Sequence, residues 1–195
     1  MSSAPRYSRH PRVGFTLVEI VIVLVLAGLL MTLGLPRLDF TRHRADAAVQ
    51  SLRAALMQAQ RTALLRQYDV VISIDTAHAA IKWFEDANND GIIQASEHTR
   101  TYPMSDQVIF LAPPVGIDGA SAPAVDGSAL GTLNSLPTVT FHRDGAATSD
   151  LILYIAGPAH PTRTYRAVRL TQSTGRTDWY RFNAAAGVWQ LAGLQ

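Results

Sequence analysis

Apolar residues form one almost uninterrupted run near the start of the chain. From Phe15 to Leu35 there are twenty-one residues, of which only Glu19 is charged. Because a helix that crosses a bilayer needs about 20 residues, the run predicts a transmembrane helical segment over residues 15–36. A charged group inside such a helix is unfavourable by roughly 2.5–3.5 kcal/mol or more at the bilayer centre. Glu19 is therefore a candidate functional residue.

A second helical pattern follows the proline, from residue 37 to about residue 67. Apolar residues recur there in alternating steps of three and four, at Val49, Leu52, Leu56, Ala59 and Ala63. This spacing is typical of one helix face. We predict that the first helix continues through residue 66 with a bend at Pro36, and that the stripe packs against the following domain.

After Tyr68 the pattern changes to short alternating segments bounded by Gly, Asn, Asp or Pro, which indicate strands. The predicted strands are 69–74, 80–84, 100–102, 108–111, 138–142, 151–155, 165–171, 179–182 and 188–191. Residues 112–137 are rich in Ala, Gly, Pro and Ser and predict a long surface loop. The fold class is α+β, with a long N-terminal helix packed on a C-terminal antiparallel β-sheet domain over residues 68–195.

The residues before the apolar run are polar and basic. Residues 1–13 contain three arginines and no acid, and the chain then reads Gly14-Phe15-Thr16-Leu17-Val18-Glu19. A secretory signal peptide has a similar order, but this run is longer and no Ala-x-Ala cleavage site follows it. An ordinary signal anchor would give no reason for an acid at position 19.

This stretch resembles the processing signal of type IV pilins and type II secretion pseudopilins, and Pro36 matches the helix kink of that family. The resemblance implies that residues 1–14 are a leader peptide. A prepilin peptidase would cleave between Gly14 and Phe15, and the new amine of Phe15 would be N-methylated. The helix would then hold the chain in the inner membrane, with the C-terminal domain in the periplasm.

The resemblance also implies a role for Glu19 in assembly. Packed side by side in a filament, apolar helices exclude water, so a carboxylate between them needs a partner. In the family the partner is the amine of the first mature residue, here Phe15, on a neighbouring subunit. The pair would set the axial register between subunits, as a single polar residue does in a coiled coil.

Segments of the β-domain are similar to the GspH/FimT pseudopilin group. They are Trp83–Glu97, Phe141–Gly145, Leu151–Ile155, Tyr165–Leu170 and Thr174–Arg176. This implies a minor pseudopilin that joins other pseudopilins near the tip of a type II secretion filament, with the help of an inner-membrane assembly platform. The alternative is a minor type IV pilin that binds DNA for uptake or primes pilus assembly.

The charge and composition of the chain bear on two possible functions, nucleic-acid binding and catalysis. The formal charge is +2, from 17 basic and 15 acidic side chains, but removal of residues 1–14 takes three arginines and leaves 14 against 15. The mature chain is therefore not basic overall, and its charge does not favour nucleic-acid binding. There is no cysteine, and no hydrolase or phosphate-binding motif, so we expect a protein that is not an enzyme.

One segment fits the calcium-loop pattern D-x-[DN]-x-[DN]-G-x5-E without a mismatch. The candidate ligands are Asp86, Asn88, Asp90, the carbonyl of Ile92, and Glu97. Calcium takes six to eight oxygens, and Gly91 allows the sharp turn. Because strands are predicted on both sides, the loop cannot be a true EF-hand, and a polar hairpin turn is the alternative. Calcium is the one cofactor that the sequence suggests.

Arginines gather near the C-terminus, close to aromatic residues. The candidates for nucleic-acid contact are Arg166, Arg169, Arg176 and Arg181. Such residues can follow a phosphate backbone and stack on bases. Some minor pilins of the similar group bind DNA near a Gly-Arg motif, but here Asp178 stands between Gly175-Arg176 and the next arginine. Solvated arginines, or arginines paired with acids, are the simpler interpretation.

Overall fold

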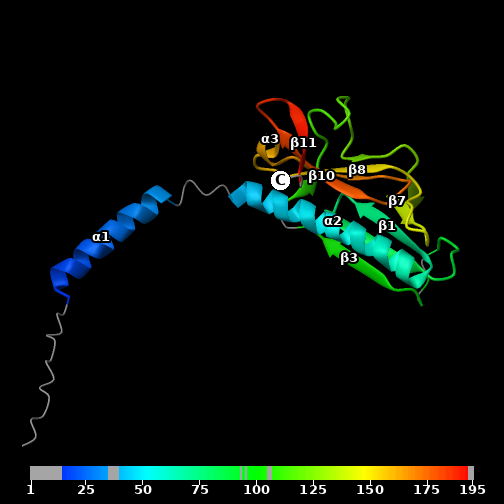
Figure 1. The fold of residues 1–195 in the computed structure, drawn as a ribbon, viewed down its shortest axis with the longest axis horizontal. Coiled ribbons are helices and arrows are strands. Elements are labelled where there is room, and N and C mark those ends of the chain that lie inside the picture. Colours follow the sequence, from blue (N-terminus) through cyan, green and yellow to red (C-terminus); the bar gives the residue numbers. More distant parts are fainter. Residues whose placement is uncertain (1–14, 35–39, 93, 95, 105–106, 193–195) are drawn as a thin grey trace, which may run out of the picture. The chain divides into compact units, whose positions relative to one another are not determined.

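The computed structural model describes residues 15–34, 40–92, 94, 96–104 and 107–192 (Figure 1). Helix α1 spans Leu17–Gly34 and belongs to a first compact unit, while α2, Phe40–Arg66, begins a second unit that extends to the C-terminus. Gly14, Leu35 and Pro36 lie outside the described residues, so the cleavage site and the bend stay predictions. Among the described residues, no helix combines the length and the hydropathy that a membrane span requires.

The β-part of the second unit is antiparallel, as predicted, and it consists of two sheets. The first has the order β3-β2-β1-β7-β6, with β1 Asp69–Asp75, β2 Ala80–Asp86, β3 Thr99–Pro103, β6 Gly131–Leu133 and β7 Leu136–Phe141. The second has the order β11-β10-β9-β8-β4, with β4 Ile109–Phe110, β8 Leu151–Ala156, β9 Arg166–Leu170, β10 Thr177–Asn183 and β11 Val188–Ala192. A short helix, α3 (Pro161–Thr164), precedes β9.

The predicted apolar stripe of α2 is the part of the helix that packs on the sheets. All five of its residues are buried, together with Ala45, Ala48 and Ala55. Leu52 and Leu56 belong to one core with side chains of both sheets, and Figure 1 shows α2 running along them. Among the side chains that the structure describes, the buried apolar ones all lie between Ala45 and Phe182, so the second unit contains its own core. The α+β prediction is confirmed.

All nine predicted strands are present, with ends that shift by one or a few residues. The prediction of one loop over residues 112–137 is wrong in part, because β5 (Val125–Asp126), β6 and the start of β7 lie within it. β5 pairs with β8, and β6 pairs with β7. The strands are too short to give an alternating pattern, so local sequence could not identify them.

The rest of that segment covers aromatic side chains of the second sheet. The hydroxyl of Tyr154 accepts the backbone N–H of Ile117 at 3.0 Å, and Trp189 Nε1 donates to the carbonyl of Val115 at 2.8 Å. Tyr165 Oη donates to the carbonyl of Ala112 at 2.9 Å. These bonds give both the aromatic groups and the irregular backbone their polar partners.

Candidate functional site

The first turn of α1 contains the predicted assembly residue. Thr16 precedes the helix, and its Oγ1 accepts the backbone N–H of Glu19 at 3.2 Å. This is an N-cap, and Thr-x-x-Glu is the sequence of a capping box. A negative charge in the first turn is also favoured by the helix dipole. The structure therefore shows Thr16 capping the helix through the backbone of Glu19, and the Thr-x-x-Glu spacing in the sequence is the signal for this helix start.

The first part of α1 presents its apolar side chains to solvent. Every side chain from Phe15 to Leu26 is exposed, with Phe15 79 % and Leu17 80 % accessible to solvent. A monomeric soluble protein rarely exposes an apolar surface of this extent. Exposed apolar surfaces of this extent are typical of sites that contact other proteins or lipid.

The predicted calcium loop connects β2 to β3, and its first residue is fixed by the sheet. Asp86 ends β2 opposite Asp69 of β1 and is only 2 % exposed. Its two carboxylate oxygens accept the backbone N–H groups of Asp90, at 3.0 Å, and Gly91, at 2.7 Å. Gly91 has a φ of +72°, which glycine adopts without strain. The carboxylate of Asp86 thus holds the start of the loop in a tight turn.

Three carboxylates of this loop come together. One oxygen each of Asp86, Asp90 and Glu97 lies within 4.8 Å of the others, and no other group of acids and histidines in the described residues could hold a metal. The carboxylate of Asp90 accepts the backbone N–H of Ile92 at 2.8 Å, which is the main reason why its pKa is lowered. Glu97 Oε1 is buried and has no hydrogen-bond partner among the described residues. Three acids of the predicted ligand set thus lie close together, while strands on both sides exclude an EF-hand; calcium binding itself stays a prediction.

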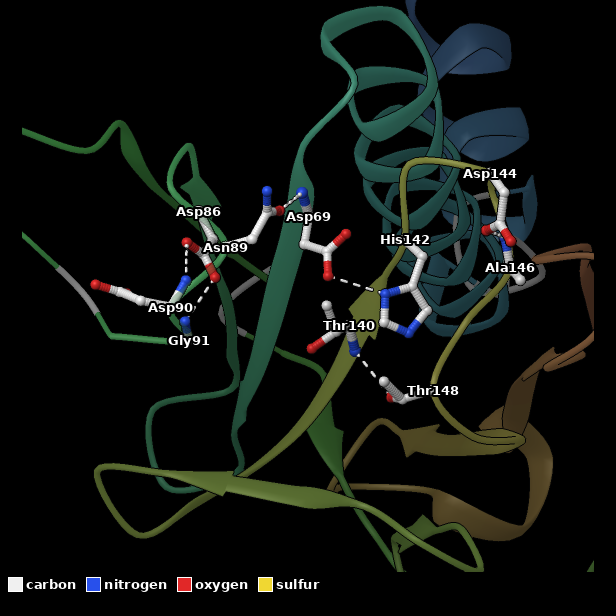
Figure 2. A network of polar contacts seen from close by, with 10 residues as sticks. All are labelled: Asp69, Asp86, Asn89, Asp90, Gly91, Thr140, His142, Asp144, Ala146 and Thr148. Atoms are coloured by element: carbon white, nitrogen blue, oxygen red, sulfur yellow. Dashed lines mark hydrogen bonds and ion pairs between the residues drawn. The ribbon is translucent and has the colours of Figure 1, made fainter.

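The loop is connected to the end of β7 through one aspartate (Figure 2). Asn89 Oδ1 accepts the backbone N–H of Asp69 at 3.0 Å, and Asp69 Oδ2 lies 2.9 Å from His142 Nδ1. Figure 2 shows Asp69 between Asn89 and His142. The sequence did not indicate this link, because its members come from three segments far apart in the chain.

The four candidate arginines all have acidic partners. Arg166 pairs with Asp46 of α2, Arg181 pairs with the same aspartate at 2.9 Å, Arg176 with Asp178, and Arg169 with Asp118 at 3.7 Å. Arg166 is 1 % exposed, so a phosphate backbone cannot reach its guanidinium. Burial lowers its pKa, and the bond to Asp46 opposes that effect. The structure therefore agrees with the simpler interpretation of the sequence, in which these arginines pair with acids.

The motifs Phe141–Gly145 and Thr174–Arg176 are both hydrogen-bonded to Gln60, a residue that the sequence analysis did not select. Gln60 of α2 donates from Nε2 to the carbonyl of Gly145, at 2.9 Å, and to that of Thr174, at 2.8 Å. The amide therefore holds the turn after β7 and the turn before β10 against the helix. The motifs Phe141–Gly145 and Thr174–Arg176 are thus neighbours in space, which only the packing of α2 decides.

Gly175→Ala is expected to destabilise the domain strongly. Gly175 has a φ of +62°, and an added Cβ would overlap the carbonyl oxygen of Gly145 and the amide of Gln60. Gly187→Ala is the matched control, since φ is +67° and nothing lies within 4 Å of its Cβ position. The control should lower the free energy of unfolding by about 1–2 kcal/mol, and Gly175→Ala by about 1–3 kcal/mol more. Urea unfolding of residues 40–195 measures both, and equal losses would contradict the close contact.

Comparison with known proteins gives similar structures only. No protein-family model matches the chain, and no curated protein matches its sequence. The chain is similar to minor pseudopilins and minor pilins of known structure. The minor pseudopilin EpsH from the type II secretion system of Vibrio cholerae has 13 % identity and a TM-score of 0.46, over 77 % of this chain and 97 % of that one. The type IV minor pilin FimU of Pseudomonas aeruginosa has 14 % identity and a TM-score of 0.47, over 75 % of this chain and 95 % of that one.

Proposed function

We propose that this chain is a minor pseudopilin of a type II protein secretion system, a structural subunit and not an enzyme. The observation that supports this most is α1, an exposed apolar helix with one carboxylate in its first turn, joined to a domain with its own core. Such a helix suits a subunit that is held in a membrane and then packs against other helices. The filament would be periplasmic, with this subunit near its tip, and would drive folded proteins across the outer membrane.

Assembly would proceed in three steps that involve different residues. Prepilin peptidase removes residues 1–14 and frees the amine of Phe15, which is methylated. The processed chain waits in the inner membrane through Phe15–Leu35, with Pro36 as a kink and the domain in the periplasm. On the assembly platform, Glu19 pairs with the Phe15 amine of a neighbouring pseudopilin, because both charges lose water there.

Gly14→Val is expected to block processing. The side chain at the predicted cleavage site would keep residues 1–14 on the chain, so the purified protein should retain the full mass of the precursor. Mass spectrometry of wild type and variant from membranes measures this. A wild-type chain that is not cut after Gly14 would contradict the assigned site.

We also propose that the β2–β3 loop binds calcium, through Asp86, Asn88, Asp90, the Ile92 carbonyl and Glu97. The three converging carboxylates support this, and a site of low affinity would be filled outside the cytoplasm. Bound calcium would stiffen the loop and, through Asn89 and Asp69, the end of β7.

Calcium at millimolar concentration is expected to raise the melting temperature of residues 40–195 by about 3–8 °C, because only the folded state binds it. Glu97→Gln should abolish the rise, since calcium loses a charged ligand. Asp118→Asn is the control, because Asp118 is an exposed acid outside the loop. Scanning fluorimetry with calcium, magnesium and chelator measures the shift, and an equal shift in the Glu97 variant would contradict the site.

The alternative is a minor type IV pilin that binds DNA or primes pilus assembly. Arg176 and Arg181 are partly exposed and could still contact a phosphate backbone, although both pair with acids. A gel-shift experiment with short duplex DNA at physiological salt separates the two functions. Salt-sensitive binding that Arg176→Ala removes would favour the pilin, and no binding would favour the secretion subunit.

A further inference from the structure

A cavity of about 230 Å³ lies where the start of α2 meets the turn between β8 and α3. Its walls include Thr41 and Arg44 of α2, Gln107, His160, and the turn 157–159. Thr164 lies behind that turn, where its hydroxyl accepts the N–H of Gly157 at 3.0 Å and donates to the carbonyl of His160 at 2.8 Å. The turn is therefore fixed, and the cavity does not depend on a loose loop.

The lining of this cavity contains two basic residues, Arg44 and His160. Within the described part of the chain, none of the lining residues is acidic. Arg44 Nη1 donates to Gln107 Oε1, which keeps the guanidinium at the cavity with further N–H groups to donate. Asp46, two residues along the helix, accepts from Arg166 and Arg181 with its two oxygens. Asp39 and Asp106, the other acids near these residues in sequence, lie outside the described residues.

The chain itself limits how far the cavity can lie from the end of α1. Six residues separate Gly34 from Thr41, and even a fully extended chain spans at most about 25 Å over these seven steps. The headgroup layer on each side of a bilayer is about 5–8 Å thick. If α1 lies in the membrane, as the proposed function requires, the cavity is within reach of lipid phosphates.

We infer that this cavity binds a phosphate group, with Arg44 as its principal ligand. A guanidinium donates charge-assisted, paired hydrogen bonds that match phosphate oxygens, and His160 and the Gln107 amide can add donors. A soluble phosphate and the headgroup of an anionic lipid both carry this chemistry. The assignment of this phosphate to a lipid headgroup rests on the proposed function. The assignment of a phosphate site to the cavity does not. A lipid held there would keep the base of the domain against the membrane before assembly.

The test begins with residues 40–195, which contain the complete core. Inorganic phosphate is titrated into wild type, Arg44→Gln and Arg61→Gln, and binding is followed by NMR shifts of the arginine side chains and of His160. Arg61 is the matched control because it is an exposed arginine of the same helix, seventeen residues or about 25 Å further along its axis. We expect Arg44→Gln to weaken binding about tenfold or more, and Arg61→Gln to have no effect. Unfolding curves verify that both variants are folded.

Vesicle sedimentation then identifies the source of the phosphate. The same three proteins are mixed with phosphatidylcholine vesicles that contain or lack phosphatidylglycerol. Binding that needs phosphatidylglycerol and Arg44, but not Arg61, supports a lipid headgroup. Binding of free phosphate without this preference supports a soluble phosphate at the same site. Equal losses of binding in Arg44→Gln and Arg61→Gln would show diffuse charge attraction only and would overturn the inference. The absence of any binding would also overturn it. Because the fragment lacks α1, neither result depends on membrane insertion or filament assembly.

Discussion

Replacing Glu19 with alanine is expected to leave a chain that is processed and stays with the membrane but no longer enters filaments. The carboxylate is the single charge of the apolar run, and in a filament it would lose its water. Without it, the amine of Phe15 on the neighbouring subunit would have no partner, which is unfavourable by several kcal/mol in a dry environment. Cross-linking and sedimentation of sheared filaments from cells measure incorporation.

The Thr16 cap seen in the structure, with Glu19 at the capping-box position, supplies a sharper control. Glu19→Gln keeps the capping box with Thr16, since glutamine serves at this position as well as glutamate. It removes only the charge. If the ion pair drives assembly, Glu19→Gln fails as Glu19→Ala does, while Thr16→Ala assembles. Rescue by glutamine, together with failure of Thr16→Ala, would show that Glu19 acts by starting the helix and not by pairing.

Asp46→Ala is expected to destabilise the second unit more than any other single removal of a charge. Its carboxylate is the acidic partner of Arg166, which is 1 % exposed, and also pairs with Arg181 at 2.9 Å. Removal would leave a buried guanidinium without a counter-charge, at a cost of about 3–5 kcal/mol. For a domain of this size, that corresponds to a fall in melting temperature of roughly 6–20 °C.

The matched control for Asp46 is Asp178→Ala. Asp178 also pairs with an arginine, but the side chain of Arg176 is 70 % exposed, so water replaces the lost partner. The expected loss is about 0–1 kcal/mol. Arg166→Met in the Asp46→Ala background should restore part of the stability, because it removes the unpaired charge. Equal melting temperatures for the two aspartate variants would show that the Asp46–Arg166 pair remains hydrated.

Local patterns account for what the sequence predicted well. The period of Val49, Leu52 and Leu56 fixes the buried face of α2, because each residue turns the helix by a constant angle. β1 and β8 do not alternate and are buried almost throughout; their short apolar runs of β-branched and aromatic residues identify them as strands. The spacing of Asp86, Asp90 and Glu97 brings their carboxylates together, because a short loop around a glycine limits how far apart they can lie.

The fates of the arginines show where such reasoning fails. Arg166 and Arg169 lie three residues apart on one strand, yet the first is buried against Asp46 and the second is near Asp118 at 3.7 Å. Asp46 is 120 residues from Arg166 and 135 from Arg181 in sequence. No local pattern could relate Asp46 to arginines so distant in sequence. From the sequence alone, the arginines were therefore treated as one group of basic residues near the C-terminus.

By itself the sequence determined the apolar run with its single acid, the order of the longer helices and strands, and the turn-forming acidic loop, since each depends on neighbours a few residues away. The tertiary structure decided how the strands divide into two sheets, that Asp46 neutralises two arginines, and that Gln60 joins two motifs. It also decided that Thr41, Arg44 and His160 share one cavity. These features depend on the packing of α2 against both sheets, which brings together groups that no local pattern connects.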